Sequence, residues 1–361
     1  MEKEILYLLA LYNCPKIGEK FIKKMIHKFG SAKNAWFADP KDLLTIPNLG
    51  KSNIQFIGDE NYFSQAEKQL QECTSNNINI VHLWESHYPF LLKQCPDAPI
   101  FLFYKGNINF NLPSISIVGT RKMTSYGKLF TENLIECLST KKINIISGLA
   151  LGIDGCAHKK AVEVNIPTIG VLAHGLNQLY PPLHETLAMN MLKNGGLISE
   201  YPVHTKPERT HFIQRNRIIA GLSSITIIIE SAYGGGAIST AKFANSYNRE
   251  VFALPGRITD ISSQGCNQLI RNLEAQIITQ PKDILSFLGD SINKIKQPEL
   301  FPNLLEDEEI IYKYLKTNGN TSIDTLAVEL SLSTFQLMPI LLNLELKNII
   351  RSNPGKYFEI A

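Results

Sequence analysis

Short apolar runs alternate with helical stretches along residues 113–285 of the chain. The runs are rich in β-branched residues and read SISIVG, INIISG, TIGVLAHG, LISEY, SITIIIE, EVFALPG and QIITQ. Apolar positions at helical spacing predict helices near residues 124–140, 152–165, 183–194 and 236–247. This alternation predicts right-handed βαβ units and a parallel-rich sheet of the α/β class, with ligands bound outside the carboxyl ends of the strands.

The pattern is helical over about the first 63 residues. Two segments there resemble each other, PKIGEKFI at 15–22 and PNLGKSNI at 47–54, and each is typical of a tight turn that opens a helix. Both are similar to helix-hairpin-helix units, whose turn can offer backbone N–H groups to a phosphate. The alternative is a small helical bundle whose glycines only permit the turns.

The segments that flank the central pattern are less regular. Residues 78–110 hold a strand-like apolar run with many proline and aromatic residues, and we expect an approach segment packed on the central domain. Residues 291–305, SINKIKQPELFPNLL, have two prolines and little periodicity. This composition predicts a linker.

The last residues predict a winged helix, since helices at 307–316, 322–330 and 334–347 precede two strands joined by a turn at 353–355. The third helix of such a module usually faces DNA. Here it contains an internal Pro339 and one basic residue, Lys347. Duplex binding needs several cations at phosphates, so a protein-contact or packing role is favoured over DNA contact.

The composition indicates the class of protein but does not identify a binding partner. The 361 residues are 44% hydrophobic and carry 36 basic against 33 acidic side chains, a net charge of +3. That charge is too small to identify a nucleic-acid binder. Neither a signal peptide nor a membrane-length apolar run is expected, and the six cysteines lack C-x-x-C spacing, which predicts a cytoplasmic protein without disulfides or zinc.

Two predicted strands end in turns suited to an anion. In the first turn, Gly119 lets the chain leave its strand sharply, and the amides from Thr120 to the helix start at Thr124 are expected to face an anion. Arg121 would add a bidentate partner for phosphate. The alternative is a structural turn with a solvated arginine.

The second turn holds Ser147 and Gly148, followed by a helix start at Asp154. Its N–H groups are expected to be free for a ligand. Asp154 is explained equally well as a residue that stabilises the helix start, and His158 as a packed histidine rather than a general base.

The segment VHTKPERTHFIQRNRII at 203–219 is the most informative one. It sets four cations against one acid, Glu208, with an aromatic ring among them. Cations interleaved with an aromatic suit a phosphate chain whose bases can stack, which describes single-stranded nucleic acid. The candidate residues are Lys206, Arg209, Phe212, Arg215, Asn216 and Arg217.

Two alternatives remain for this segment. One is a solvated basic face, and the other buries Arg215 or Arg217 against Glu200 or Glu230 as a structural pair. In a helix that begins near Phe212, Arg215 shares the face below the ring, whereas Asn216 and Arg217 turn away.

Catalytic motifs are missing from the sequence. Three glycines at 234–236 follow a predicted strand and permit close approach of a ligand, although a glycine run alone is a weak signal. There is no G-x-S-x-G elbow, no G-x-x-x-x-G-K-[ST] loop and no metal-ligand spacing. We therefore expect a binding protein rather than an enzyme, without a metal or cofactor.

These residues carry a resemblance to a known family. The motifs GTR with YG, SGLALGIDGCAH, GLNQLYPP, ISEYP, FIQRNRIIAGLS and LPGRITDISSQGCNQLIR occur in order over about residues 80–285. Together they resemble the DNA processing protein A (DprA, or Smf) family. Gly235 departs from the family pattern, which commonly has serine there, and puts a hydroxyl contact at that position in doubt.

The resemblance implies an extended Rossmann-like domain at 78–290, a helical domain of sterile-alpha-motif type at 1–70, a linker at 291–305 and a winged helix at 306–361. It implies a homodimer that binds and protects incoming single-stranded DNA and loads the RecA recombinase in natural transformation. Arg121 matches the arginine of the family's G-[ST]-R motif, and the basic segment matches F-x-x-R-N-R. The alternative is a nucleotide-binding enzyme of the phosphoribohydrolase-like group, whose P-G-G-x-G-T-x-x-E signature the chain does not reproduce.

Overall fold

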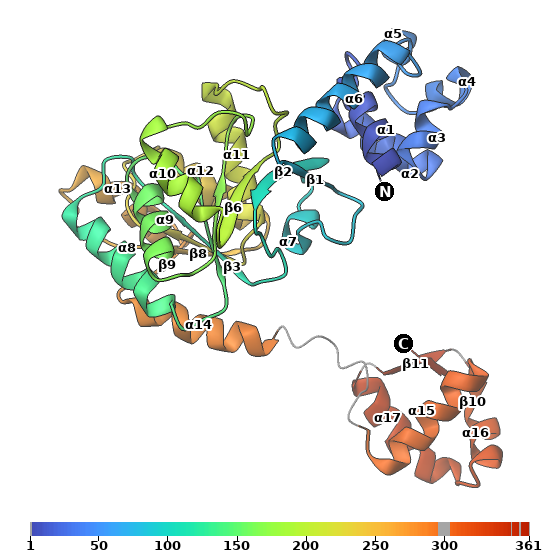
Figure 1. The fold of residues 1–361 in the computed structure, drawn as a ribbon. Coiled ribbons are helices and arrows are strands. Elements are labelled where there is room, and N and C mark those ends of the chain that lie inside the picture. The colour runs from blue at the N-terminus through green and yellow to red at the C-terminus, as the bar shows by residue number, and fades with distance from the viewer. Residues whose placement is uncertain (1, 295–303, 348, 354, 361) are drawn as a thin grey trace. The chain divides into compact units, whose positions relative to one another are not determined.

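Two units, Met1–Ser286 and Phe287–Ala361, make up the chain (Figure 1). The structure is a computed structural model that describes residues 2–294, 304–347, 349–353 and 355–360. The first unit contains a large sheet with helices on both faces, and the second is a small module of helices and three strands. Each is described by itself.

A nine-stranded sheet in the order β1-β2-β6-β5-β4-β3-β7-β8-β9 organises the first unit. Its strands from β6 to β9 in this order pair in parallel. The seven apolar runs correspond to β3 (Ser114–Val118), β4 (Asn144–Ser147), β5 (Thr168–Val171), β6 (Gly195–Ser199), β7 (Ile225–Ile228), β8 (Glu250–Ala253) and β9 (Gln276–Ile277). The predicted α/β class with a parallel-rich sheet is therefore confirmed.

The segment at 78–110 belongs to this sheet. It forms β1 (Asn79–His82) and β2 (Phe101–Gly106), with the short helix α7 (Phe90–Lys93) between them. The strand β2 pairs antiparallel with both β1 and β6. The prediction of an approach segment packed on the central domain was therefore incomplete. The buried residues 101–103 belong to a strand that extends the sheet itself.

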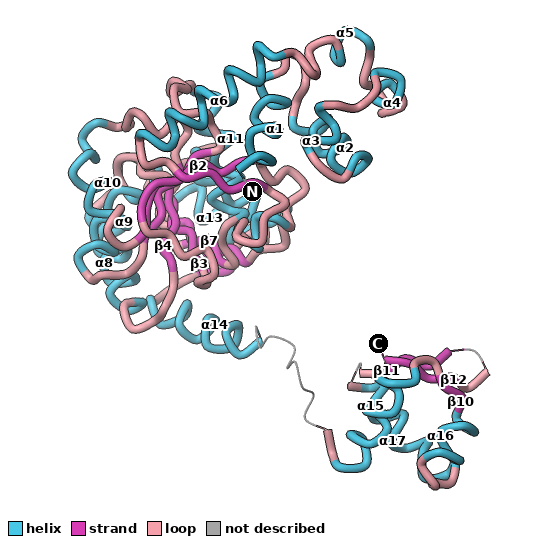
Figure 2. The backbone as a smooth tube through the Cα atoms, turned by 45° about the vertical axis from the view of Figure 1, so that its right-hand side comes forward, coloured by secondary structure: helices cyan, strands magenta, loops and turns pink. Residues whose placement is uncertain are grey.

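Two groups of helices cover the two faces of the sheet (Figure 2). The alternation of side chains along β3 shows this: Ser116 donates a hydrogen bond to the carbonyl of Ile219 on one face, while its neighbours Ile115 and Ile117 point to the other. On the Ser116 side lie α11 (Arg209–Gly221), α12 (Gly236–Ser246) and α13 (Gln264–Arg271). On the other side lie α8 (Ser125–Leu138), α9 (Ile153–Glu163) and α10 (Glu185–Met191).

Six helices precede the sheet: α1 (Glu2–Asn13), α2 (Glu19–Phe29), α3 (Ala32–Trp36), α4 (Pro40–Leu44), α5 (Lys51–Ile54) and α6 (Glu60–Ser75). The two similar segments have the same backbone geometry. Lys16 and Asn48 adopt φ of 66° and 68°, and Gly18 and Gly50, which precede α2 and α5, adopt φ of −90° and −98°. The side chain of Asn53 joins the two turns by donating to the carbonyl of Lys16 at 3.0 Å. The sequence repeat is therefore a structural repeat.

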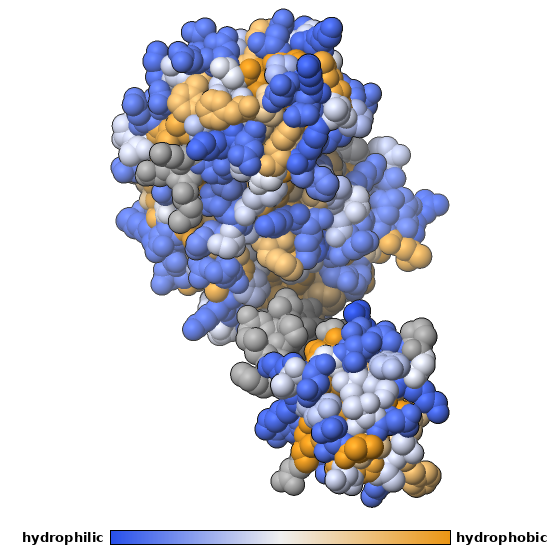
Figure 3. Space-filling model, turned by 90° about the vertical axis from the view of Figure 1, so that its right-hand side faces the viewer, coloured by the Kyte–Doolittle hydropathy of each residue, from blue (hydrophilic) through white to orange (hydrophobic). Residues whose placement is uncertain are grey.

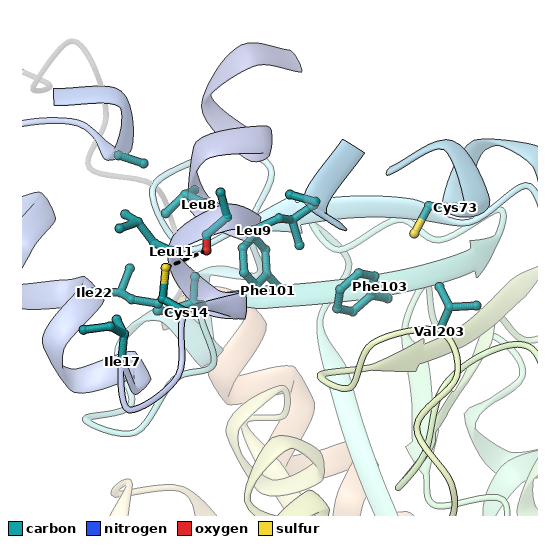
Figure 4. Close-up of a cluster of buried hydrophobic side chains, with 14 of the residues drawn as sticks. Leu8, Leu9, Leu11, Cys14, Ile17, Ile22, Cys73, Phe101, Phe103 and Val203 are labelled. Carbon is teal, nitrogen blue, oxygen red and sulfur yellow. Dashed lines mark hydrogen bonds between the residues drawn. The ribbon is translucent and has the colours of Figure 1, made fainter. Parts of the chain in front are cut away.

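These helices share a hydrophobic core with the antiparallel edge of the sheet (Figure 4). Leu8, Leu11 and Ile22 are buried in the same cluster as Phe101 and Phe103 of β2. The expected division at 1–70 and 78–290 stays a prediction, since the whole of Met1–Ser286 forms one unit. Of the expected linker, residues 291–294 end the helix α14 (Pro281–Lys294), and residues 295–303 lie outside the described residues.

The second unit has the order of a winged helix. It contains α15 (Glu306–Asn318), β10 (Thr321–Ser322), α16 (Ile323–Glu329), α17 (Thr334–Leu346), β11 (Ile350–Asn353) and β12 (Tyr357–Ile360). The strands pair in the order β10-β12-β11. The three predicted helices and the hairpin are confirmed, and the short strand β10 is an addition to the prediction.

Apolar side chains on the face drawn in Figure 3 form separate patches among hydrophilic ones. No single helix of the described residues is both long and apolar enough to cross a membrane. The pair Ile323–Glu329 and Thr334–Leu346, bent by 114°, reaches that length and composition only when its two helices are taken together.

Candidate nucleic-acid interface

A cleft of about 840 Å³ opens at the carboxyl ends of β3 and β7. These strands are neighbours in the sheet, but the chain leaves β3 toward β4 on one side and leaves β7 toward β8 on the other. Such a switch point is where doubly wound sheets bind ligands. The turns after both strands and the first half of α11 line the cleft.

The turn after β3 holds Arg121 at the cleft. Its backbone is fixed from below, where the carbonyl of Thr120 accepts a hydrogen bond from the amide of Ile153 at 3.2 Å. Gly152, with φ of 82°, brings its own backbone against Thr120 so closely that a Cβ there would overlap the Thr120 carbonyl oxygen. Gly119, Thr120 and Arg121 all line the cleft, as the sequence predicts.

The start of α8 is not free for an anion. The amide of Thr124 donates to Oε2 of Glu230 at 2.9 Å, and the Thr124 hydroxyl donates to the same carboxylate. Oγ1 of Thr124 in turn accepts from the amide of Gly127 at 3.2 Å. The expected anion contact at Thr124 is therefore wrong, because a buried carboxylate of the protein already occupies that position.

Cationic and aromatic side chains meet at the mouth of the cleft. The guanidinium of Arg121 lies 5.6 Å from the ring centre of Phe212, and the ring of Tyr180 meets Phe212 edge-on at 5.7 Å. Arg121 is exposed, Phe212 is half-buried and Tyr180 is 46% exposed. These are the geometries of a cation–π contact and an aromatic pair that leave ring surface open to solvent.

The helix α11 begins at Arg209, three residues earlier than the sequence suggests. Arg209 is exposed and lines the cleft on the first turn of the helix. Lys206 is also exposed, on the loop before α11, and is not among the residues that line the described cleft. The cleft therefore has two exposed arginines at its rim, with a lysine on the approach.

Arg215 is a buried structural residue. It is 4% exposed, and its guanidinium donates to the carbonyl of Gly148 at 2.8 Å and to that of Val171. Burial lowers its pKa to about 10 despite the nearby carboxylate of Asp154. The side chain thus holds the ends of β4 and β5 in place and reaches the cleft only as part of its floor.

The turn after β4 is also occupied by contacts within the protein. Oδ2 of Asp154 accepts hydrogen bonds from the amides of Gly148 at 3.1 Å and Ala150 at 3.4 Å. The Ser147 hydroxyl is buried and donates to the carbonyl of Ile117 at 2.6 Å. The prediction that Ser147 and Gly148 offer free groups to a ligand is wrong, because protein atoms already satisfy them.

Asp154, which lines the cleft, and His158, which does not, are both buried. Nδ1 of His158 lies 2.7 Å from the hydroxyl of Thr168, which itself donates to the carbonyl of Ile145. The imidazole is therefore the donor to Thr168, and burial lowers its pKa to about 3. Burial raises the pKa of Asp154, although the charge of Arg215 opposes the shift. The packed-histidine interpretation of His158 is the one that fits.

Arg217 points away from the cleft. Its guanidinium pairs with the carboxylate of Glu200 and donates to the carbonyl of Asp97. Burial raises the pKa of Glu200 to about 7, and the charge of Arg217 opposes this shift. The structural pair that the sequence left open is thus Arg217 with Glu200, and Arg217 has no part in the described cleft.

Asn216 and the glycine loop form the wall opposite Arg121. Nδ2 of Asn216 donates to the hydroxyl of Ser239 at 2.9 Å, which ties α11 to α12 beside the cleft. A Cβ on Gly234 or Gly236 would meet no atom within 4 Å, whereas one on Gly235 would lie 2.5 Å from Oγ of Ser231. The wall therefore presents bare backbone, and a serine at 235 would require its neighbours to move.

Tyr180 and Ile213 line the cleft but were not among the predicted site residues. Tyr180 lies within the GLNQLYPP motif, in the loop after β5, far in sequence from the basic segment. An aromatic residue before two prolines, in a turn after a parallel strand, was the signal that could have found it.

Acidic groups contribute little to the cleft. Asp154 is the one carboxylate among its described lining residues, and it is 6% exposed. Within the residues that the structure describes, no group of three or more His, Cys, Asp or Glu side chains is placed to bind a metal ion.

Comparison with known proteins identifies the family. The model of the DNA recombination-mediator protein A family matches residues 79–289, which is more than half of the chain. The chain belongs to this family. A DprA winged helix domain matches residues 298–356, so the second unit is that domain.

Curated relatives in this family are DNA-processing proteins by name. Protein Smf of Escherichia coli is 34% identical over 81% of this chain and 80% of its own length. The DNA processing protein DprA of Bacillus subtilis is 36% identical over 73% of this chain and 91% of its own length. The predicted DprA/Smf resemblance is confirmed.

Solved structures agree with the fold. DprA of Streptococcus pneumoniae has 30% sequence identity and a TM-score of 0.68, over 78% of this chain and 97% of that one. DprA of Helicobacter pylori has 28% identity and a TM-score of 0.54, over 59% and 96%. The latter structure is described as showing a single-stranded DNA binding mode of that protein.

Proposed function

We propose that this protein binds single-stranded DNA in the cleft at the ends of β3 and β7. The observation that carries the proposal is the group formed by Arg121, Phe212 and Tyr180, in which a cation and two rings share an open rim. Phosphates would pair with Arg121 and Arg209, and an unpaired base would stack on the exposed ring surface.

The aromatic rim favours a single strand over a duplex. A base inside a duplex is stacked on both faces, so it cannot lie on a protein ring unless it leaves the helix. The turn around Gly119 and the bare backbone at Gly234–Gly236 allow the sugar-phosphate chain to come close to the sheet edge. Lys206, on the loop before α11, would extend the electrostatic path beyond the cleft.

The proposed contact set is smaller than the sequence suggested. It keeps Gly119, Thr120, Arg121, Lys206, Arg209 and Phe212 and adds Tyr180. Four residues are assigned to support instead, because their polar atoms are already engaged by the protein: Ser147, Gly148, Arg215 and Arg217. Asn216 lies at the wall and joins two helices, so its contribution is positional.

We further propose that the bound strand is protected and passed to the RecA recombinase during natural transformation, and that the protein acts as a homodimer in the cytoplasm. Membership of the DprA family supports these roles. An apolar surface supports the dimer: Leu273 is 93% exposed and Ile277, on the edge strand β9, is 51% exposed.

Nothing in the cleft favours the alternative, an enzyme acting on small nucleotides, so we do not propose it.

Fluorescence anisotropy with a labelled single strand tests the binding proposal. We expect the double variant Arg121→Ala with Arg209→Ala to weaken binding and to make the log–log salt slope shallower by about 2, since about two phosphate contacts are lost. Lys141→Ala with Lys142→Ala, before β4 and hence at the opposite end of the strands, is the matched control. Unchanged affinity in the cleft variant would place the DNA elsewhere.

The transfer step needs a separate assay. We expect the wild type to speed the onset of RecA ATPase activity on a single strand covered by single-strand-binding protein, and the Arg121→Ala, Arg209→Ala variant to lose this effect. Sedimentation of wild type and Leu273→Glu tests the dimer, because a buried glutamate at an apolar interface should shift the protein toward monomer. A wild type that sediments as a monomer would contradict the dimer.

A further inference from the structure

A second positively charged surface lies on the N-terminal helices. A groove of about 440 Å³ runs between α2 and the segment after α4, and it shares no lining residue with the cleft. Its lining consists of Lys23, Lys24, His27, Lys28, Thr45, Ile46 and Pro47. Three lysines and a histidine therefore line a concave surface that contains no acidic side chain in its described lining.

The spacing of cations on α2 creates this surface. Lys20, Lys24 and Lys28 recur every four residues, and Lys23 and His27 lie beside them on the same side of the helix. Residues 14–54 contain eight lysines against three acidic residues, a net charge of +5, whereas the whole chain carries only +3. This short segment thus has a larger net positive charge than the chain as a whole.

Backbone oxygens hold these lysines in place. Nζ of Lys24 donates to the carbonyl of Pro47 at 3.2 Å, and Nζ of Lys23 to that of Ala98 at 2.5 Å. Nζ of Lys28 donates to the carbonyl of Asp42 at 2.5 Å and to the hydroxyl of Thr45. Because these acceptors are neutral, they position the ammonium groups without cancelling their charge, and each ammonium has three donors to use.

None of the three acidic residues of the segment is among the described residues that line the groove. Glu19 is half-buried, and burial raises its pKa while Arg217 and Lys23 oppose the shift. Oδ1 of Asp39 accepts from the amide of Lys41 at the start of α4. The side chain of Asp42 does not line the groove, although its carbonyl holds Lys28. Lys23 therefore lies near acidic groups, whereas the described hydrogen-bond partners of Lys24 and Lys28 are neutral oxygens, so these two lysines carry the positive charge of the groove.

We propose that this groove binds the sugar-phosphate backbone of duplex DNA, as a second nucleic-acid surface separate from the single-strand cleft. A row of lysines attracts a polyanion of matching charge. No phenylalanine, tyrosine or tryptophan ring lines the groove, in contrast to the cleft, so it offers backbone contacts but no platform for an unstacked base. A protein with both surfaces could hold a single strand beside a duplex.

Binding of a short blunt duplex to the full-length protein, followed by anisotropy over a series of salt concentrations, tests this proposal. Lys24→Gln with Lys28→Gln keeps long polar side chains and removes two charges. We expect duplex affinity to fall about tenfold and the salt slope to become shallower by about 2. The matched control is Lys33→Gln with Lys41→Gln, which removes the same charge from the same segment outside the groove lining.

The outcomes separate this proposal from the single-strand site. The groove variant should keep its affinity for a single strand, and the Arg121→Ala, Arg209→Ala variant should keep its affinity for the duplex. Circular dichroism and thermal unfolding of the groove variant establish that it is folded. The proposal is overturned if the wild type does not bind the duplex, or if the groove and control variants lose affinity equally. It is also overturned if the groove variant alters only single-strand binding.

Discussion

The helices α11 and α17 expose very different side chains. α11 carries three arginines, of which only Arg209 is exposed at the cleft, and it gains its aromatic contact from Phe212. α17 occupies the position of a recognition helix, yet four of its apolar side chains are exposed: Phe335 (88%), Met338, Leu342 and Leu346. The helix in the recognition position therefore exposes apolar side chains, where α11 offers an arginine and an aromatic ring to the cleft.

The interiors beneath the two helices differ as well. At the cleft end of α11, Arg215 is buried near the buried carboxylate of Asp154. α17 packs Leu337, Leu341 and Leu344 into an apolar cluster, and its neighbouring cation, Lys347, is paired with Glu308. Buried polar groups with fixed hydrogen-bond partners hold the neighbouring loops in one arrangement. An apolar core stabilises the fold without specifying the loop positions in this way.

The largest effect should come from removing a cation of α11 that does not contact DNA. We expect Arg215→Ala to lower the free energy of unfolding by about 3–5 kcal/mol, since it leaves the buried Asp154 without its compensating charge. Arg121→Ala, its exposed counterpart, should change stability by only about 0.5 kcal/mol. Urea unfolding of both variants makes the measurement. Full stability of Arg215→Ala together with lost DNA affinity would make Arg215 a binding residue.

The next effect concerns the ring on α11. Phe212→Ala should weaken single-strand binding by about 1–3 kcal/mol, because it removes the surface on which a base can stack. Phe335→Ala, on α17, is the matched control and should leave binding unchanged. Titration of both variants at one salt concentration compares them. Equal losses would mean that both helices contact the strand and would remove the contrast between them.

A smaller effect should appear in the pH dependence of stability. His158 is buried as a neutral imidazole with its pKa lowered to about 3, so its contribution is fully present above about pH 6.5 and is lost as the pH falls from there. His158→Asn keeps a donor for Thr168 but does not titrate. The variant should be less stable than the wild type near neutral pH, and this gap should narrow on acidification by up to about 1.4 kcal/mol per pH unit. A gap that stays constant with pH would show that folding does not lower the pKa of His158.

The sequence predicted the architecture because its signals were local and repeated. Apolar runs and turn glycines along the chain were enough to place β3 to β9 and the three helices of the winged helix. In residues 78–110 the strand-like run was recognised, but its membership of the sheet was not: β2 pairs antiparallel with both β1 and β6, and a segment rich in proline and aromatic residues has no clear period of two to indicate this.

The site was harder to predict, because the fate of each arginine depends on distant partners. Arg215 and Arg217 lie two residues apart and look alike in sequence, yet one is held by the carbonyls of Gly148 and Val171 and the other by Glu200. Spacing turned both Asn216 and Arg217 away from the face of Phe212, yet Asn216 lines the cleft and Arg217, which was also a candidate contact, does not. It could not show that the amide of Gly148 is occupied by Asp154, because that contact requires the folded turn.

The smallest expected effect falls on α17. Phe335→Lys adds a cation to the most exposed apolar position of that helix, and we expect the free energy of unfolding to change by only about 0.5 kcal/mol, because the side chain is 88% exposed. If α17 does not contact the strand, single-strand affinity should also stay close to that of the wild type. If α17 lies on DNA, the added charge should strengthen binding and steepen the salt slope by about 1. Anisotropy over a salt series distinguishes the two. A steeper slope would show that the apolar face of α17 approaches nucleic acid, and that the contrast with α11 is one of degree.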